Sequence, residues 1–154
     1  AHGSDGQPYY LPADTDRSAI EKTALPAAAI GSSLRELAGR IVVLLDTCHQ
    51  EGEGGGIMKA IASSETQVTV LSASSGKQYA QENERWLNGA FCQGILEGLD
   101  GKADYTKDGQ ISVNELEIYV RKSVKTLTGG AQIPISAKPF TARDFPIAFV
   151  NKDK

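Results

Sequence analysis

Apolar and polar positions fall into blocks along the chain, and the blocks alternate between two kinds of pattern. Residues 41–45 are a continuous run of Ile, Val and Leu, which predicts a strand buried on both faces of a parallel sheet. A second apolar run at 68–72 predicts another strand. Over 86–99, and again after Ser112, apolar residues recur at helical spacing. The alternation of strands with helices predicts the α/β class, with a mostly parallel central sheet flanked by helices.

Two capping-box patterns, in which a Glu follows a Ser by three residues, predict where helices begin. Ser112 and Glu115 begin a helix that the glycines at 129–130 end. Ser33 and Glu36 predict a short helix just before the first strand. The apolar face of the longer helix consists of Leu116, Tyr119, Val120, Val124 and Leu127.

The remaining segments contribute little further regular structure. Residues 3–33 are rich in Gly, Pro, Ser and Asp, which predicts a surface loop with at most a short extended piece at Tyr9–Leu11. A short helix at 57–64 and a last strand at Pro146–Val150 complete the pattern. So few strands make a small sheet, and the chain starts abruptly at Ala-His-Gly. We therefore predict a single domain over 1–154 whose first strands come from an upstream segment or a companion chain.

Composition removes several classes of function. The formal net charge is −3, and no run of Lys and Arg or interleaving of basic and aromatic residues occurs, so a nucleic-acid partner is not expected. No apolar stretch approaches the roughly 18 residues that span a membrane. The two cysteines, Cys48 and Cys92, do not form a disulfide framework. A reducing cytoplasmic setting is expected, and it would keep a reactive thiol usable.

The first strand runs directly into the polar sequence Asp-Thr-Cys-His at 46–49. Polar residues that follow a buried strand lie at the carboxyl edge of the sheet, where open α/β sheets bind ligands. A cysteine at that place can be a nucleophile if a histidine activates it, or it can simply be a buried small hydrophobe, and the strand alone favours neither. Upstream, His2 supplies a candidate base. His49 is the rival base, but neighbours on an extended chain point to opposite faces, which favours His2.

These residues carry a family resemblance. His2-Gly3 and the stretch 44–49, Leu-Leu-Asp-Thr-Cys-His, resemble the His-Gly and Asp-x-Cys-His motifs of clan CD cysteine peptidases, in the metacaspase and prokaryotic caspase-like (orthocaspase-like) branch. The stretches at 88–91, 96–99 and 127–130 are also similar to the prokaryotic members. The His-to-Cys separation is close to the roughly 50 residues usual for caspases.

The resemblance implies a caspase-like fold and the hydrolysis of peptide bonds through a thioester. In this chain it makes Cys48 the nucleophile and His2 the general base, and the backbone N–H groups of Gly3 and Cys48 the donors that hold the oxyanion. Residues 1–154 would then be the catalytic portion of one caspase-like domain.

Asp46 is the candidate specificity residue. Alternate positions of a strand share a face, so Asp46 and Cys48 are expected to point into the same cleft. Metacaspases carry Asp at this place and bind Arg or Lys before the cut, so the resemblance implies protein or peptide substrates with a basic residue there. The alternative is an Asp that caps a turn at the end of the strand.

The chain departs from the family pattern in two ways. The family's usual Ser-Gly after Cys-His is Gln50-Glu51 here, so the loop beside the nucleophile differs. Calcium-dependent metacaspases carry an acidic cluster after His-Gly and an Asp seven residues past the Cys, whereas position 55 is Gly here and the short 3–33 segment holds Asp5, Asp14 and Asp16. We therefore do not expect that calcium switch, and we expect no cofactor.

A second calcium pattern lies at 104–115, which matches the spacing of an EF-hand loop. Its candidate ligands include Asp104, Asp108 and Glu115. A weak ligand at Thr106, a positive charge at Lys107 and a preceding helix that ends near Leu99 count against it, so the sequence favours no metal at this loop.

Three functions are thus open from the sequence. The favoured one is a cysteine endopeptidase that cleaves after Arg or Lys. The alternatives are a calcium-binding regulatory module built on 104–115, and an inactive scaffold on the caspase fold in which Gln50-Glu51 marks a lost site.

Overall fold

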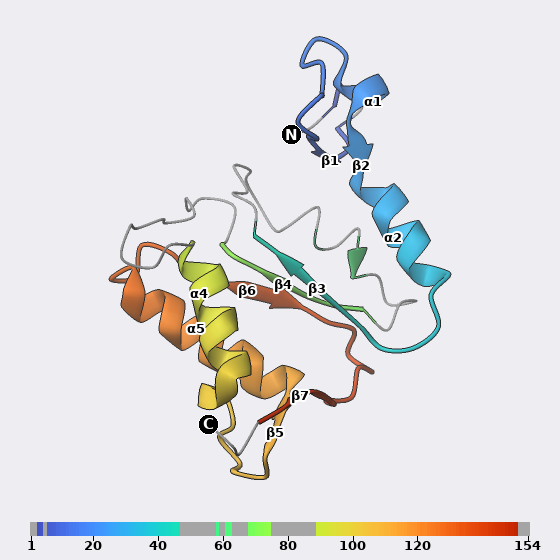
Figure 1. Ribbon diagram of the computed structural model, residues 1–154. Helices are drawn as coiled ribbons and strands as arrows, with labels where there is room; N and C mark the ends of the chain where they lie inside the picture. The colour runs from blue at the N-terminus through green and yellow to red at the C-terminus, as the bar shows by residue number, and fades with distance from the viewer. Residues whose placement is uncertain are drawn as a thin grey trace.

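The computed structural model describes residues 3–4, 6–46, 58, 61–62, 68–74 and 89–150 of the chain (Figure 1). Its elements, in chain order, are β1 (Tyr9–Tyr10), α1 (Ile20–Thr23), β2 (Leu25–Pro26), α2 (Ala27–Arg35), β3 (Ile41–Leu45), β4 (Val68–Ser72), α4 (Ala90–Glu97), the π-helical turn η1 (Gly98–Lys102), β5 (Gln110–Ser112), α5 (Val113–Leu127), β6 (Ile135–Ala137) and β7 (Pro146–Phe149).

The central sheet has the strand order β3-β4-β6. Strands β3 and β4 are parallel and pair over their full lengths, from Ile41 opposite Val68 to Leu45 opposite Ser72. Strand β6 runs antiparallel to β4, because the chain returns to the sheet after α5. The α/β class is therefore confirmed, and the sheet is mixed.

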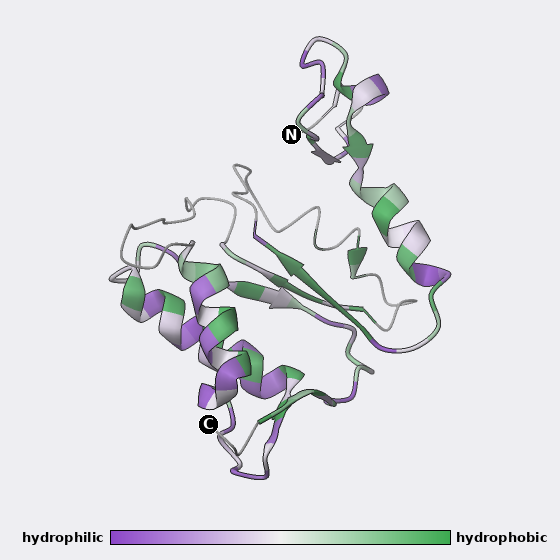
Figure 2. Cartoon of the chain, viewed as in Figure 1, coloured by the Kyte–Doolittle hydropathy of each residue, from purple (hydrophilic) through white to green (hydrophobic). Residues whose placement is uncertain are grey.

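Strand β4 separates two apolar cores. Val68 and Val70 belong to the core that contains Ala27 of α2, whereas Leu71 and Ala73 belong to the core formed with α4 and α5. This division follows from the alternation of side chains along a strand. In Figure 1, α4 and α5 cover one side of the sheet and α2 lies on the other. Figure 2 shows that β3 and β4 are largely apolar and that apolar and polar residues are interspersed along α4 and α5.

Strand β3 differs from the expectation that it is buried on both faces. Leu44 is 43% exposed, and the other residues of β3 are half-buried. The reason is its position at the edge of the sheet: among the described residues, no strand pairs with its outer side.

Helix α5 follows the sequence prediction closely. The Ser112 hydroxyl accepts a hydrogen bond from the Glu115 amide at 3.2 Å, and the Glu115 carboxylate accepts one from the Ser112 amide at 3.0 Å, which completes the capping box. The glycines that end the helix have φ of +59° (Gly129) and +86° (Gly130), which favour residues without a Cβ.

The N-terminal third contains more structure than its composition predicts. Residues 27–35 form α2, and β1 pairs with β2. The extended piece predicted at Tyr9–Leu11 is present as β1, but the interpretation of the rest of 3–33 as a loop is wrong. The helix predicted to begin at Ser33 is wrong as well, since Ser33 lies in the last turn of α2. Three consecutive alanines at 27–29 favour helix formation, and Ile30 packs against the core beneath.

Two smaller predictions have different outcomes. Met58 and Ile61, within the helix predicted at 57–64, are helical and buried, Ala62 forms a bend, and the other residues of that range lie outside the described residues. The predicted last strand is confirmed as β7, which pairs antiparallel with β5, a strand that the sequence did not predict.

Candidate active site

The carboxyl ends of the two parallel strands meet at one edge of the sheet. Leu45, the last residue of β3, lies opposite Ser72, the last residue of β4. Beyond the strands, the Ala73 amide still donates to the Leu45 carbonyl at 2.9 Å, so the two chains leave the sheet together. This carboxyl edge is the kind of place where α/β sheets bind ligands and carry reactive side chains.

On the β4 side, the carboxyl edge is polar and buried. Ser72 and Ser74 are each 1% exposed, and among the described residues the Ser72 hydroxyl has no hydrogen-bond partner. Gln132 is fully buried and donates from its side-chain amide to the Ala73 carbonyl at 2.9 Å. The Thr128 hydroxyl in turn accepts from the Gln132 backbone amide at 3.1 Å. The residue pair Ser72-Ala73 is therefore held from the C-terminal end of α5.

Sequence reasoning missed Ser72, Ser74 and Gln132. A signal for the two serines was present, because Ser-Ala-Ser at 72–74 comes directly after the largely apolar residues 68–71, just as Asp-Thr-Cys follows the run at 41–45. No local signal marks Gln132, whose partner is 59 positions away along the chain.

Asp46 is exposed and is the first residue after β3. Its place at the carboxyl edge agrees with the prediction. However, β3 ends at Leu45, so Asp46 is not part of a strand. The prediction that Asp46 and Cys48 share a strand face is therefore not tested. Cys48, His2 and the rival base His49 lie outside the described residues, and the predicted pairing of Cys48 with His2 stays a prediction.

Gly3, the predicted oxyanion donor next to His2, is part of a tight turn. Its amide donates to the Gln7 carbonyl, and its carbonyl accepts from the Gly6 amide, both at 3.0 Å. An oxyanion role would therefore require the Gly3 amide to exchange its Gln7 partner for the substrate.

Among the described residues there is one free cysteine, Cys92, which is half-buried on α4, as expected for a packing residue.

At the loop 104–115, the candidate metal ligand Glu115 is occupied with hydrogen bonds. The Glu115 carboxylate accepts from the amides of Tyr105 at 3.1 Å and Thr106 at 3.0 Å. The hydrogen bond from the Ser112 amide is the main reason that the pKa of Glu115 is lowered. Burial raises this pKa in part, and the hydrogen bonds from Thr106 lower it further. Within the part of the chain that the structure describes, no three His, Cys, Asp or Glu side chains are arranged to hold a metal ion.

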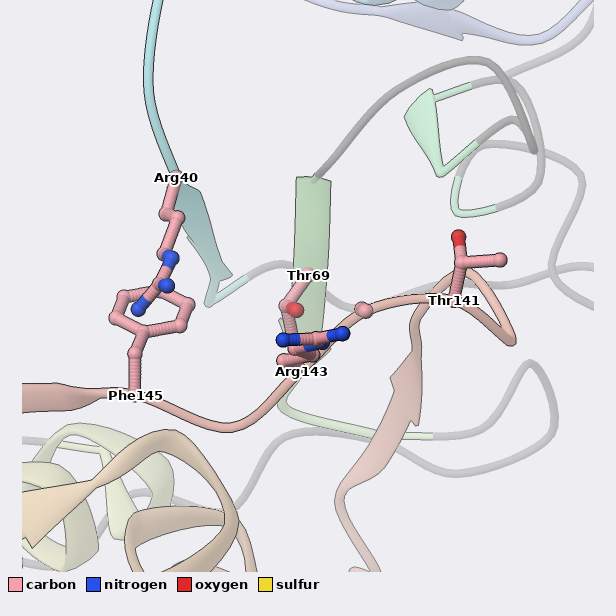
Figure 3. Close-up of a pocket in the computed structure, with 6 residues that line it drawn as sticks. Arg40, Thr69, Thr141, Arg143 and Phe145 are labelled. Carbon is pink, nitrogen blue, oxygen red and sulfur yellow. The ribbon is translucent and has the colours of Figure 1, made fainter.

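A cavity of about 170 Å³ lies at the opposite, amino ends of β3 and β4 (Figure 3). Arg40 precedes β3 and places its guanidinium 5.0 Å from the centre of the Phe145 ring. Arg143 and Thr69 line the same cavity. Two arginines repel a basic side chain, so this cavity does not suit the substrate residue that the sequence predicts.

The fold and the carboxyl edge together define an α/β domain with polar residues at the carboxyl ends of two parallel strands. The family model of the caspase domain matches residues 1–146, and the chain belongs to this family. Membership supports a function of the cysteine-peptidase type. Comparisons with curated proteins and with solved structures found no match. None of the described helices is long and apolar enough to cross a membrane.

Proposed function

We propose that this chain is the catalytic portion of a cysteine endopeptidase, in the metacaspase and prokaryotic branch of the family, that cleaves peptide bonds after Arg or Lys. The observation that carries the proposal is the exposed carboxylate of Asp46 at the carboxyl end of β3, two residues before Cys48 in a caspase domain. Cys48 is three residues from the end of β3, so the covalent chain keeps its Cα within roughly 11 Å of that of Leu45.

In the proposed reaction, the Cys48 thiolate attacks the carbonyl carbon of the scissile bond, and the amides of Gly3 and Cys48 hold the negative charge that develops on the oxygen. As the bond to nitrogen breaks, protonated His2 donates a proton to the leaving amine. A water molecule then gives its proton to His2 and attacks the thioester, which releases the acid product and restores the thiolate.

Asp46 would recognise the residue before the cut. A carboxylate binds an Arg guanidinium through two charge-assisted hydrogen bonds, whereas a Lys ammonium offers a single compact charge. The exposure of Asp46 supports this role, because an exposed residue at the carboxyl end of β3 can be reached by a substrate side chain. Arg should therefore be preferred over Lys, and a substrate Asp should be repelled.

The test is cleavage of four matched peptides with Arg, Lys, Leu or Asp before the scissile bond, by the wild type and by Asp46→Asn. The variant keeps the shape and removes the charge, so kcat/KM for the Arg peptide should fall by at least roughly 30-fold, the equivalent of about 2 kcal/mol. Asp14→Asn, which changes an exposed carboxylate far from the carboxyl edge in sequence, is the matched control. A wild type that prefers Leu or Asp, or an Asp46→Asn protein that keeps its full Arg preference, would refute the pocket.

We also propose that another strand completes the sheet at the outer side of β3. The exposure of Leu44 on this apolar strand supports the idea, because an unpaired edge of this kind is ready to pair with further chain. The strand would come from an upstream segment or a companion chain.

A cytoplasmic location is proposed as well, because it would keep the Cys48 thiol reduced.

A further inference from the structure

The loop that joins η1 to α5 borders a cavity of about 200 Å³. Four residues of the loop line it: Asp108, Gln110, Ser112 and Glu115. In a twelve-residue loop that begins at Asp104, these are positions 5, 7, 9 and 12, which are four of the six positions from which an EF-hand loop coordinates calcium. A further carboxylate, that of Asp144, reaches the cavity from the segment before β7.

The backbone of the loop has two left-handed residues. Lys107 has φ of +60° and Gly109 has φ of +83°. The second is position 6 of the loop, where a sharp turn requires glycine in EF-hands. Lys107 is exposed, so its ammonium lies in solvent. The positive charge that counted against calcium in the sequence can therefore stay hydrated while the loop binds a cation.

Asp104 is the feature that points to a missing ligand. Its side chain faces into the loop, where one carboxylate oxygen (Oδ2) accepts from the Gly109 amide at 3.2 Å. The residue is 7% exposed, and its other oxygen, Oδ1, is buried without a hydrogen-bond partner among the described residues. An unpaired buried carboxylate oxygen is costly, because it has lost its water without gaining a donor or a cation.

The helix before the loop extends a few residues beyond the end that the sequence predicts near Leu99. The chain remains helical into η1 and turns at Gly101, whose φ is +113°, so that Asp104 follows directly. The helical turn η1 ends at Lys102, so a single residue, Ala103, separates it from the start of the loop at Asp104. Helices α4 and α5 pack against each other on either side of this turn, and Ile111, at position 8, is fully buried beneath it.

We propose that residues 104–115 bind one Ca²⁺ ion. The ligands would be carboxylate oxygens of Asp104, Asp108 and Glu115, the Thr106 hydroxyl and the Gln110 carbonyl, with Ser112 reached through water. In the described structure these carboxylates are not yet gathered around one point, so binding has to draw them together. Glu115 exchanges its bonds from the Tyr105 and Thr106 amides for the cation, and its second oxygen can keep the Ser112 amide of the capping box. The proposal is separate from the peptidase function, since calcium binding can be measured without turnover.

Calcium is a better match than magnesium. The ligands are all oxygens, as hard divalent cations require, and EF-hand loops supply six or more of them in a flexible arrangement that suits calcium, whereas magnesium demands near-ideal octahedral geometry. Three carboxylate ligands together with a hydroxyl at position 3 are fewer charges than the tightest loops use, so a Kd on the order of 10⁻⁴ M is expected.

The experiment is isothermal titration of the chelator-treated whole chain with CaCl₂ up to about 10 mM, paired with thermal unfolding. The wild type should bind one equivalent, and its Tm should rise with calcium concentration, because calcium binds the folded state alone. Asp104→Asn keeps the side-chain volume and an acceptor for the Gly109 amide, and it should weaken binding at least roughly tenfold. Asp14→Asn, in an exposed turn outside the loop, should bind as the wild type does.

Lys107→Asn provides a second test that does not endanger the fold, since Asn tolerates a positive φ. Removing the positive charge from the loop should tighten calcium binding by roughly threefold or more. Absence of saturable binding by the folded wild type, or an Asp104→Asn protein with wild-type affinity, would overturn the proposal. Unchanged affinity in Lys107→Asn would also count against a cation within this loop.

Discussion

Gln132 shows how a single side chain can hold the carboxyl edge. It is fully buried between the end of α5 and the end of β4, and its amide group satisfies the Ala73 carbonyl. Replacing it with an apolar side chain of similar size would leave that carbonyl buried without its donor.

We therefore expect Gln132→Met to lower the free energy of unfolding by about 1–3 kcal/mol, the usual cost of an unsatisfied buried polar group. Urea denaturation would measure the difference, and the slope m should be unchanged, since the folded state remains equally compact. A Gln132→Met protein with the stability of the wild type would show that water replaces the amide and that the residue does not hold the edge.

Sequence reasoning at the residue scale succeeded where the signal was local. The position of Asp46 at the end of a strand follows from the apolar run before it, and the capping pair of Ser112 and Glu115 follows from their spacing. Gln132 could not be found in this way, because only the folded chain brings it to Ala73. Asp104 was found by its spacing, but its burial and unpaired oxygen depend on tertiary packing.

At the scale of elements, α4 and α5 are joined by a polar cluster around Glu97. The Glu97 carboxylate accepts hydrogen bonds from the Gln93 side-chain amide, the Lys102 ammonium and the Tyr119 hydroxyl, each at 2.8 Å. The Lys102 bond, with those from Gln93 and Tyr119, lowers the pKa of Glu97 from its ordinary 4.5 to about 2. Burial and the neighbouring Glu97 raise the pKa of Tyr119 to about 12.

This cluster predicts a particular acid sensitivity. A carboxylate whose pKa is lower in the folded state stabilises the fold above its unfolded pKa, and the contribution disappears as the pH falls through the folded pKa. The excess stability of the wild type over Glu97→Gln should therefore be full above pH 4.5 and should vanish as the pH falls towards about 2. Urea unfolding at several pH values would measure it. A stability difference that does not change with pH over this window would mean that the carboxylate contributes through shape alone.

The elements themselves were predicted unevenly, for physical reasons. Long helices with a continuous apolar face, such as α5, and the buried strand β4 were found because their patterns extend over many residues. Strands β5 and β6 have three residues each and depend on partners distant in sequence, so no local pattern marks them. Helix α2 was missed because Gly, Pro and Ser around it favoured the interpretation as a loop.

For the whole molecule, the two proposed sites are apart. The carboxyl edge of β3 and β4 carries the candidate peptidase site, whereas the loop 104–115, which includes β5, lies beyond the far end of α4 and pairs with β7 (Figure 1). Calcium at that loop would join α5 to the segment before β7, where the Asp144 carboxylate already accepts from the Asn114 amide at 3.0 Å. Its expected effect is therefore on stability, and not on the cleavage proposed at the carboxyl edge.

The most direct test of the central claim is labelling of the folded protein with an electrophile that carries an arginyl side chain, followed by mass spectrometry of its peptides. A nucleophilic Cys48 beside a pocket formed by Asp46 predicts one adduct, on Cys48, with Cys92 unmodified. Loss of the general base in His2→Ala should lower the rate of peptide turnover by roughly 10²–10⁴. Cys48→Ala should show neither labelling nor turnover. An adduct on Cys92 instead, or a folded wild type that is not labelled, would contradict the account.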